Sequence, residues 1–371
     1  MGCGCASLTA IFFFLAMALL LVVSIPNPVA LTLAAAAAVM PVPTFVFLVL
    51  QLDRYEREPW QVLLAAFLWG ALVATFFSAV FNDLIGAIVS AAVGKGLGSV
   101  ITASAVAPVV EETAKGAALL LLILLLRSEF DDVLDGIVYG SLVGIGFAMT
   151  ENVLYFGRVY QEGGLAGLGV LFYVRVVLGG FGHALYTGSS GAALGLAREM
   201  SNKALAPFVA FTGWILAIAQ HGTWNLLAGA LVPAALPDLN PLILLFVVMP
   251  LQSLVLTGPG LLTLLVIAIF AWRRESRVLR IHLRDEVNNG HVTADEYAVL
   301  HSQRARFRTE MSALRRGGIG KWLARRAFHQ TATELAFRKW HLSRGERPRR
   351  GMRLTPEDRY RQQLATLRAA L

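Results

Sequence analysis

The sequence has little charge and almost no cysteine. Only 15% of its 371 residues are charged, whereas soluble proteins average about 25%. The two cysteines, Cys3 and Cys5, both lie at the extreme N-terminus, which excludes a disulfide framework or a cysteine-based zinc site inside the fold. The HExxH, Walker and GxSxG motifs are also absent, so the common zinc-protease, nucleotide-binding and serine-hydrolase signatures are excluded.

Long apolar runs take the place of charge. The sequence is 56% hydrophobic with a mean hydropathy of +0.63, and a membrane span needs about 20 mostly apolar residues. We therefore predict an all-α, polytopic transmembrane helix bundle. The stretch 83–105, rich in Gly, Ala and Ser, is predicted to be a surface or re-entrant helix. About eight spans are expected, over residues 8–25, 29–50, 60–82, 106–127, 133–156, 170–197, 204–232 and 242–272.

The charge is divided unevenly along the chain. Residues 1–272 hold 9 Lys/Arg and 14 Asp/Glu, whereas residues 273–371 hold 23 and 10. We therefore predict a transmembrane domain over residues 1–272 and a basic, helical, cytoplasmic tail over residues 273–371. Thr293 and Glu296 have the spacing of a capping box that begins a helix in this tail.

Basic residues of the tail alternate with aromatic ones, namely Trp322, Phe328, Phe337 and Trp340. Such a segment can lie on an anionic lipid surface, which is one expected partner beside the membrane lipid bilayer itself. A solvated helical tail is the alternative. Nucleic acid is not an expected partner, because no supporting motif is present.

The Lys/Arg distribution also predicts an orientation. With the N-terminus in the cytoplasm, the cytoplasmic loops hold Arg54 and Arg57, Arg127, Arg198 and Lys203. The exterior loops then hold little basic charge, as the positive-inside rule requires. An even number of spans places both termini in the cytoplasm of a multi-pass plasma-membrane protein.

Two adjacent carboxylates interrupt an apolar helix near residue 111. Glu111 and Lys115 are four residues apart and share a helix face, whereas Glu112 points about 100° away. One carboxylate can pair with Lys115 while the other faces a cavity. The alternative is a salt bridge at a helix end near the membrane interface.

Later apolar segments add more polar groups: Glu151 with Asn152, then His183, then His221 with Asn225. His221 and Asn225, at i and i+4, share one helix face. Gly140 and Gly144 precede Glu151 and allow close helix packing. A single histidine in a membrane helix is often a packing residue, but no other histidines occur in residues 1–272.

Ionisable residues at membrane depth are costly and usually functional. Carboxylates and imidazoles on several helices are what a buried water-activating or metal-binding site requires. We therefore expect an intramembrane hydrolase. A proton-coupled transporter is the main alternative, although no inverted repeat is visible. A non-catalytic membrane scaffold that acts through its basic tail is the second.

The order of these motifs resembles the PrsW family of intramembrane proteases, which are distant relatives of CAAX-processing and bacteriocin-processing membrane proteases. The motifs are EExxK at Glu111, FxxxEN ending at Glu151 and Asn152, a helical His183, and HxxxN at His221. The segment DRYEREP at 53–59 also looks like that family, and the resemblance covers roughly residues 40–230.

The resemblance implies a bacterial plasma-membrane endopeptidase of the metalloprotease class. Its substrate would be a single-pass membrane protein, such as an anti-sigma factor. Glu111 and Glu112 would be catalytic carboxylates, and Glu151, His183 and His221 would be further site residues. In the CAAX-processing relatives a histidine usually replaces Glu151, and a glutamate-activated water without metal is an alternative there.

Our expected mechanism assigns a role to each group. Glu111 takes a proton from water, Lys115 holds its partner carboxylate, and His221 with Asn225 polarises the scissile carbonyl. If Zn2+ is bound, its expected ligands are His183, His221 and one of Glu112 or Glu151. Asn152 adjoins Glu151 in the same expected site.

Overall fold

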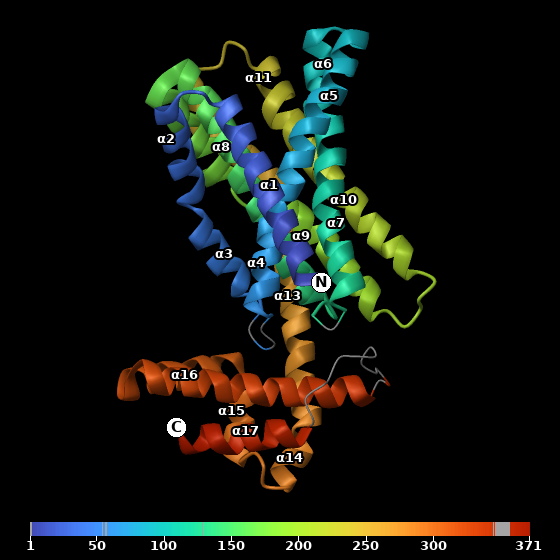
Figure 1. Cartoon of the computed structure of the whole chain (residues 1–371), viewed down its shortest axis with the longest axis vertical. Coiled ribbons are helices and arrows are strands. Elements are labelled where there is room, and N and C mark those ends of the chain that lie inside the picture. The colour runs from blue at the N-terminus through green and yellow to red at the C-terminus, as the bar shows by residue number, and fades with distance from the viewer. Residues whose placement is uncertain (1, 54, 56–57, 128, 344, 346–356) are drawn as a thin grey trace. The chain divides into compact units, whose positions relative to one another are not determined.

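The computed structural model describes residues 2–53, 55, 58–127, 129–343, 345 and 357–371, and these residues form helices and turns without a strand (Figure 1). The chain therefore has the expected all-α class. Its α-helices and π-helical segments (η) are α1 Gly2–Ser24, α2 Pro28–Val39, α3 Val42–Leu50, α4 Trp60–Leu68, η1 Trp69–Ala74, α5 Thr75–Val93, α6 Lys95–Ile101, η2 Thr102–Val106, α7 Ala107–Leu125, α8 Val133–Phe172, η3 Tyr173–Leu178, α9 Gly182–Glu199, α10 Ala206–Leu226, η4 Leu227–Leu231, α11 Val232–Ala235, α12 Pro241–Ile243, η5 Leu244–Val248, α13 Met249–His282, α14 Arg284–Asn288, α15 Ala294–Leu300, α16 Gln303–Ser343 and α17 Glu357–Ala369.

The chain forms two compact units. Unit 1 contains Met1–Leu52 and Glu58–Val266, and unit 2 contains Asp53–Arg57 and Ile267–Leu371. The division falls inside α13, a few residues before the predicted boundary at 272. The short segment after α3 was not expected in unit 2. Its Tyr55 is buried, and the phenol donates a hydrogen bond to the His301 carbonyl oxygen at 3.0 Å.

Two helix starts in unit 1 follow from capping residues. The Asn27 side chain accepts hydrogen bonds from the backbone N–H groups of Val29 and Ala30, so α2 begins at Pro28. Asp132 caps α8 in the same way, and Asp135 accepts in return from the Asp132 N–H at 2.9 Å. These caps explain why new helices begin after the gaps between the predicted spans, at Pro28 and at Val133.

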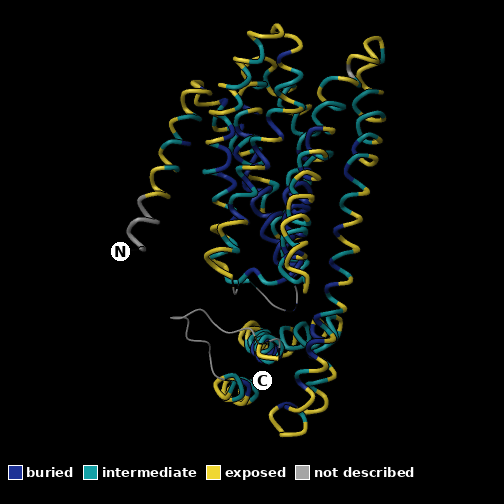
Figure 2. The backbone as a smooth tube through the Cα atoms, turned by 90° about the vertical axis from the view of Figure 1, so that its right-hand side faces the viewer, coloured by how far each residue is buried: buried dark blue, intermediate teal, exposed yellow. Residues whose placement is uncertain are grey.

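Close contact between α8 and α9 forms the centre of unit 1, where Figure 2 shows the buried backbone. A Cβ atom at Gly144 would lie 2.2 Å from the His183 carbonyl oxygen, and one at Gly140 would lie 2.4 Å from that of Thr187. The missing side chains therefore let α9 approach α8, which confirms the close packing predicted for this glycine face.

The gap between the predicted spans 133–156 and 170–197 corresponds to a break in α8. The two helical parts of α8 reverse direction at Gly164, whose φ is +61°. A Cβ atom at Gly167 would lie 2.9 Å from Val159, and the Phe156 and Phe172 rings lie 6.1 Å apart, so the two parts pack antiparallel.

The chain then stays helical to Leu178, and a turn at 179–181 interrupts the run that we predicted as one span over 170–197. His183 consequently lies in the first turn of α9 rather than in the middle of a helix.

The stretch 83–105 forms neither a surface helix nor a re-entrant helix of its own. α5 extends to Val93, the chain reverses at Gly94, and α6 with η2 leads back into α7. The apolar glycine-rich sequence therefore lengthens two neighbouring helices into a hairpin.

Much of the outer surface of unit 1 is apolar. On α1, for example, Phe12, Leu19 and Val23 are each at least 60% exposed, which suits lipid rather than water as the surrounding solvent. Four helical stretches of the described chain are long and apolar enough to cross a membrane: Pro28–Leu50, Trp60–Val93, Val133–Glu199 and Pro241–Asn288. The fold is thus that of an all-α membrane protein.

Unit 2 has a small core of its own. Phe328 is 1% exposed and belongs to this core, and Phe337 is 2% exposed, so neither ring faces a lipid surface as the sequence suggested. Glu286 is fully buried and is bonded by Arg361 and Lys339. Burial raises the pKa of Glu286, but these cationic partners outweigh it and lower the pKa to about 2.

We expect Gly144→Ala to destabilise unit 1 by about 1–3 kcal/mol, because the new Cβ would overlap the His183 carbonyl oxygen. Thermal unfolding in detergent measures this. Gly116→Ala on α7 is the matched control, since its nearest neighbour would be a Trp214 atom at 3.9 Å. Equal stability of both variants would contradict the close-packing argument.

Candidate active site

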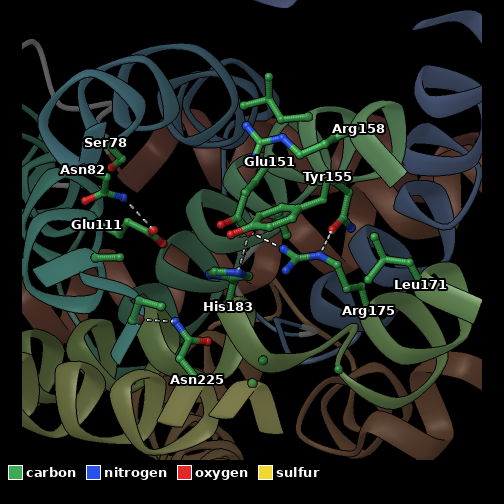
Figure 3. Close-up of a pocket in the computed structure, with 18 of the residues that line it drawn as sticks. Ser78, Asn82, Glu111, Glu151, Tyr155, Arg158, Leu171, Arg175, His183 and Asn225 are labelled. Atoms are coloured by element: carbon green, nitrogen blue, oxygen red, sulfur yellow. Dashed lines mark hydrogen bonds and ion pairs between the residues drawn. The ribbon is translucent and has the colours of Figure 1, made fainter. Parts of the chain in front are cut away.

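A cavity of about 1280 Å³ in unit 1 contains most of the polar side chains singled out in the sequence. Its walls come from α5, α7, α8, η3, α9 and α10 (Figure 3). The residues that line it include Glu111, Glu151, His183, His221 and Asn225. Segments more than 100 residues apart in the chain therefore meet at one site.

Lys115 on α7 is fully buried and pairs with the two preceding glutamates unequally. Its Nζ lies 2.8 Å from Glu112 Oε1 but 3.5 Å from Glu111 Oε2. Glu112 Oε2 also accepts a hydrogen bond from the Thr187 hydroxyl at 2.9 Å. The Lys115 ammonium lies 3.7 Å from the centre of the Phe147 ring, which adds a cation–π contact.

Glu111 is the carboxylate of this pair that faces the cavity. Its Oε1 accepts a hydrogen bond from the Asn82 side-chain amide at 3.2 Å. Its Oε2 is buried and has no hydrogen-bond partner among the described residues. Figure 3 shows Glu111 directed into the cavity beside Asn82. Glu111 therefore retains a free acceptor where a substrate or water can enter.

His183 joins two charged groups through its two ring nitrogens. Nδ1 lies 2.9 Å from the Lys115 ammonium, and Nε2 lies 3.1 Å from Glu151 Oε2. An ammonium group only donates hydrogen bonds. A protonated Lys115 therefore makes Nδ1 the acceptor and leaves the proton of neutral His183 on Nε2, directed at Glu151.

Arg175 of η3 holds Glu151 from the other side (Figure 3). Its guanidinium is bonded to the Glu151 carboxylate, and its Nε donates to Asn152 Oδ1 at 2.6 Å. The guanidinium also lies 4.2 Å from the centre of the Tyr155 ring. Asn152 thus contacts Arg175 in this structure, and it supports Glu151 indirectly.

His221 approaches the same group from α10. Its Nδ1 lies 3.1 Å from Glu112 Oε1, and its Nε2 lies 3.8 Å from Glu111 Oε2. The Tyr186 ring stacks on its imidazole at 5.0 Å. Asn225, one turn later, donates its side-chain amide to the Ala103 carbonyl oxygen at 2.9 Å, so it lines the cavity without touching His221 through a hydrogen bond.

Three of these side chains form a group able to hold a metal ion. Glu111, His183 and His221 each offer one donor atom, and these atoms lie within 4.8 Å of one another. The expected carboxylate ligand was one of Glu112 or Glu151. The structure instead engages Glu112 with Lys115 and Thr187, and Glu151 with Arg175, and it places Glu111 in the donor group.

The donor group fits a catalytic zinc site in composition and approximate size. One oxygen and two nitrogen donors with an open side are typical of such sites, and bonds of about 2.0–2.2 Å place tetrahedral donors about 3.3 Å apart. The distance of 3.8 Å between His221 Nε2 and Glu111 Oε2 is close to this. His183 would have to give up one of its present contacts to bind the ion.

The sequence reading missed several residues of the site. Arg175 could have been singled out from the sequence, because it is a single basic residue in the apolar run 170–197. Nothing in the sequence singles out Asn82, Thr187 or Tyr186, since polar or aromatic residues of these types occur throughout membrane helices. Their roles depend on which helices meet, which the linear sequence does not state.

An apolar helical bundle that encloses paired carboxylates and imidazoles in an open cavity is the arrangement expected of an intramembrane hydrolase. Comparison with known proteins identifies the family. The family model for "PrsW family intramembrane metalloprotease" matches residues 58–255. The chain belongs to this family, and it is therefore an intramembrane endopeptidase.

Individual relatives agree with this assignment. The chain is 30% identical to Protease PrsW of Bacillus subtilis (strain 168) over 180 residues, which is 48% of this chain and 75% of the relative. It is 31% identical to Protease PrsW of Geobacillus kaustophilus (strain HTA426) over 178 residues, or 47% and 72% of the two chains. No solved structure matches.

We expect Arg175→Gln to destabilise unit 1 by about 2–4 kcal/mol, because it leaves Glu151 charged and uncompensated. Adding Glu151→Gln should recover part of this loss. Denaturant unfolding of the two single variants and the double variant gives the coupling energy. Strict additivity of the two losses would contradict an ion pair at this position.

Proposed function

We propose that Glu111 is the carboxylate that acts at the scissile peptide bond. The observation that carries this proposal is its buried Oε2, which lines the cavity and accepts no hydrogen bond from the described residues. Glu112 and Glu151 are less suited, because their carboxylates are engaged by cations and hydroxyl donors. Their role in this scheme is to hold Lys115 and His183.

In the proposed reaction Glu111 takes a proton from a water that attacks the carbonyl carbon of an unwound substrate segment. Glu111 then gives this proton to the amide nitrogen as the C–N bond breaks, so that the new N-terminus leaves as an amine. His221 and Asn225 stabilise the oxyanion that forms. Asn225 has two amide protons, and one of them is used by the Ala103 carbonyl. Glu112 orients His221 through the contact at Nδ1, and Lys115 keeps Glu112 in place.

Zinc is the metal that we propose, and Glu111, His183 and His221 would hold it. In that form Glu111 and His221 would act as ligands, and the roles of base and oxyanion donor given to them above would apply to the metal-free form. Zinc lowers the pKa of a bound water to about 7, so that hydroxide forms near neutral pH. In a metal-free enzyme the same cavity would depend on Glu111 alone to activate water. Metal analysis distinguishes these two mechanisms.

The proposed substrate is a single-pass membrane protein, with an anti-sigma factor as the specific candidate. The cavity supports a peptide substrate by its size, because 1280 Å³ exceeds the range of about 300–1,000 Å³ for small-molecule pockets. A cavity open within an apolar bundle also allows a membrane segment to enter laterally and unwind.

For the membrane arrangement we propose eight spans with both termini in the cytoplasm of a plasma-membrane protein. Successive long segments of unit 1 run in alternate directions in Figure 1, which supports this topology. The distribution of Lys and Arg supports the orientation. Residues 1–272 would carry the protease activity, and residues 273–371 would form the cytoplasmic tail.

Glu111→Gln is expected to lower the cleavage rate of a tagged single-pass substrate by about 10²–10⁴-fold, because the amide cannot accept the proton. Membrane insertion and thermal stability should change little. Glu162→Gln provides a control, since that glutamate is exposed beside the reversal at Gly164. An active Glu111→Gln enzyme would refute the assigned role.

Metal content tests the donor group separately. We expect purified wild type to hold one zinc per chain, and His221→Ala and Glu111→Gln to lose it. Asn225→Ala should keep the metal, because the Asn225 amide contacts a carbonyl oxygen outside the donor group. It should cleave more slowly, because the oxyanion loses one of its two proposed donors. Cleavage by metal-free wild type that resists chelators would establish the glutamate-only mechanism.

A further inference from the structure

Helix α16 consists of two antiparallel helices that meet at residue 318 and form a hairpin. Gly318 has a φ of +71°, which permits the reversal. Arg306 is bonded to the Thr333 hydroxyl and to the His329 carbonyl oxygen, and Glu310 is bonded to His329 at 2.8 Å. The residue numbers of the Arg306–Thr333 pair and of the Glu310–His329 pair add to the same value, as two antiparallel helices require.

The end of this hairpin projects beyond its last polar contact. Eight residues separate Glu310 from Gly318, which is about 12 Å of helix at 1.5 Å per residue. We call residues 315–323 the hairpin tip. Its apolar members are unusually open, because Ile319 is 67% exposed and Leu323 is 52% exposed. These two side chains are four residues apart and share a helix face.

The charge around the tip has one sign. Residues 311–333 contain no aspartate or glutamate, and the tip residues Arg315, Arg316 and Lys321 are exposed. Arg325 and Arg326 follow in the second helix. Exposed aliphatic residues flanked by cations, in a stretch of sequence without acidic residues, form an amphipathic end rather than an ordinary solvated surface.

We propose that the hairpin tip docks on an anionic phospholipid surface, with Arg315, Arg316 and Lys321 on lipid phosphates and with Ile319 and Leu323 in the acyl boundary. The charges are complementary to such a surface. Helix α13 belongs to the apolar stretch Pro241–Asn288 and continues into unit 2, so a bilayer is always within reach of the tail. This role goes beyond peptide hydrolysis and does not depend on it.

A nucleic acid is a poorer fit for this surface. Single strands bind by stacking bases on exposed aromatic rings, but Phe328 is buried and the Trp322 ring is covered by Arg326 at 4.5 Å. The open apolar groups of the tip are aliphatic. Binding of the tip to RNA therefore serves as a competing outcome of the experiment.

The experiment places a fluorophore at the tip of the full-length protein. Cys3→Ser and Cys5→Ser remove the natural thiols, and Ile319→Cys is labelled with an environment-sensitive dye. The protein is reconstituted in nanodiscs of phosphatidylcholine with or without phosphatidylglycerol. We expect blue-shifted emission, and quenching by nitroxide-labelled acyl chains, only with phosphatidylglycerol. Gln363→Cys on α17, which is also exposed, is the matched control and should show neither.

Charge reversal completes the test. Each basic residue contributes about fivefold to binding at an anionic surface, so Arg315→Glu, Arg316→Glu and Lys321→Glu together should weaken tip association by at least about a hundredfold. Equal emission in both lipids would mean that the tip is in water or against protein, and it would overturn the proposal. A blue shift of the emission that occurs only when RNA is added would also overturn the proposal. Peptide cleavage is not the readout, so failure here leaves the protease assignment intact.

Discussion

The buried ammonium group of Lys115 is the constraint on which the site depends. An unpaired cation in an apolar bundle is costly, and Lys115 is fully buried between Glu112 and His183. From His183 the contacts continue to Glu151 and then to Arg175. Positive and negative groups alternate along this series, so each charge is compensated only while α7, α8, η3 and α9 keep their relative positions. The same series holds Glu111 and His221 beside the cavity.

Irregular backbone supplies the room that this arrangement needs. The turn at 179–181 interrupts an apolar run just before His183, and it lines the cavity, where exposed backbone groups can be satisfied. π-helical segments also adjoin the helices of the site: η2 precedes α7, η3 precedes that turn, and η4 follows α10. Such segments are frequent at functional sites. The catalytic region of this protease is thus built where its membrane helices depart from regularity, beside a regular and closely packed contact of α8 with α9.

A large part of the fold and of the site could be predicted from the sequence. Long apolar runs indicate membrane helices whatever their partners are, and Asn27 and Asp132 mark helix starts by local capping. Polar residues at membrane depth stand out because their burial is costly, which is why the motif residues could be singled out. The hairpin at 83–105 and the turn at 179–181 could not be predicted, because glycine-rich apolar sequence is compatible with a helix, a turn or a bend.

The sequence by itself determined the membrane class, the family and the set of ionisable residues that meet in the cavity. Only the tertiary structure decided which carboxylate faces the cavity, since Glu111 and Glu112 are adjacent and chemically identical. The tertiary structure also brought Arg175, Asn82 and Thr187 to the site, and it buried Phe328 and Phe337 inside unit 2. Composition and helical spacing are local properties that a sequence displays directly. The partner of a buried charge is set by which distant helices pack together, and no local pattern specifies that.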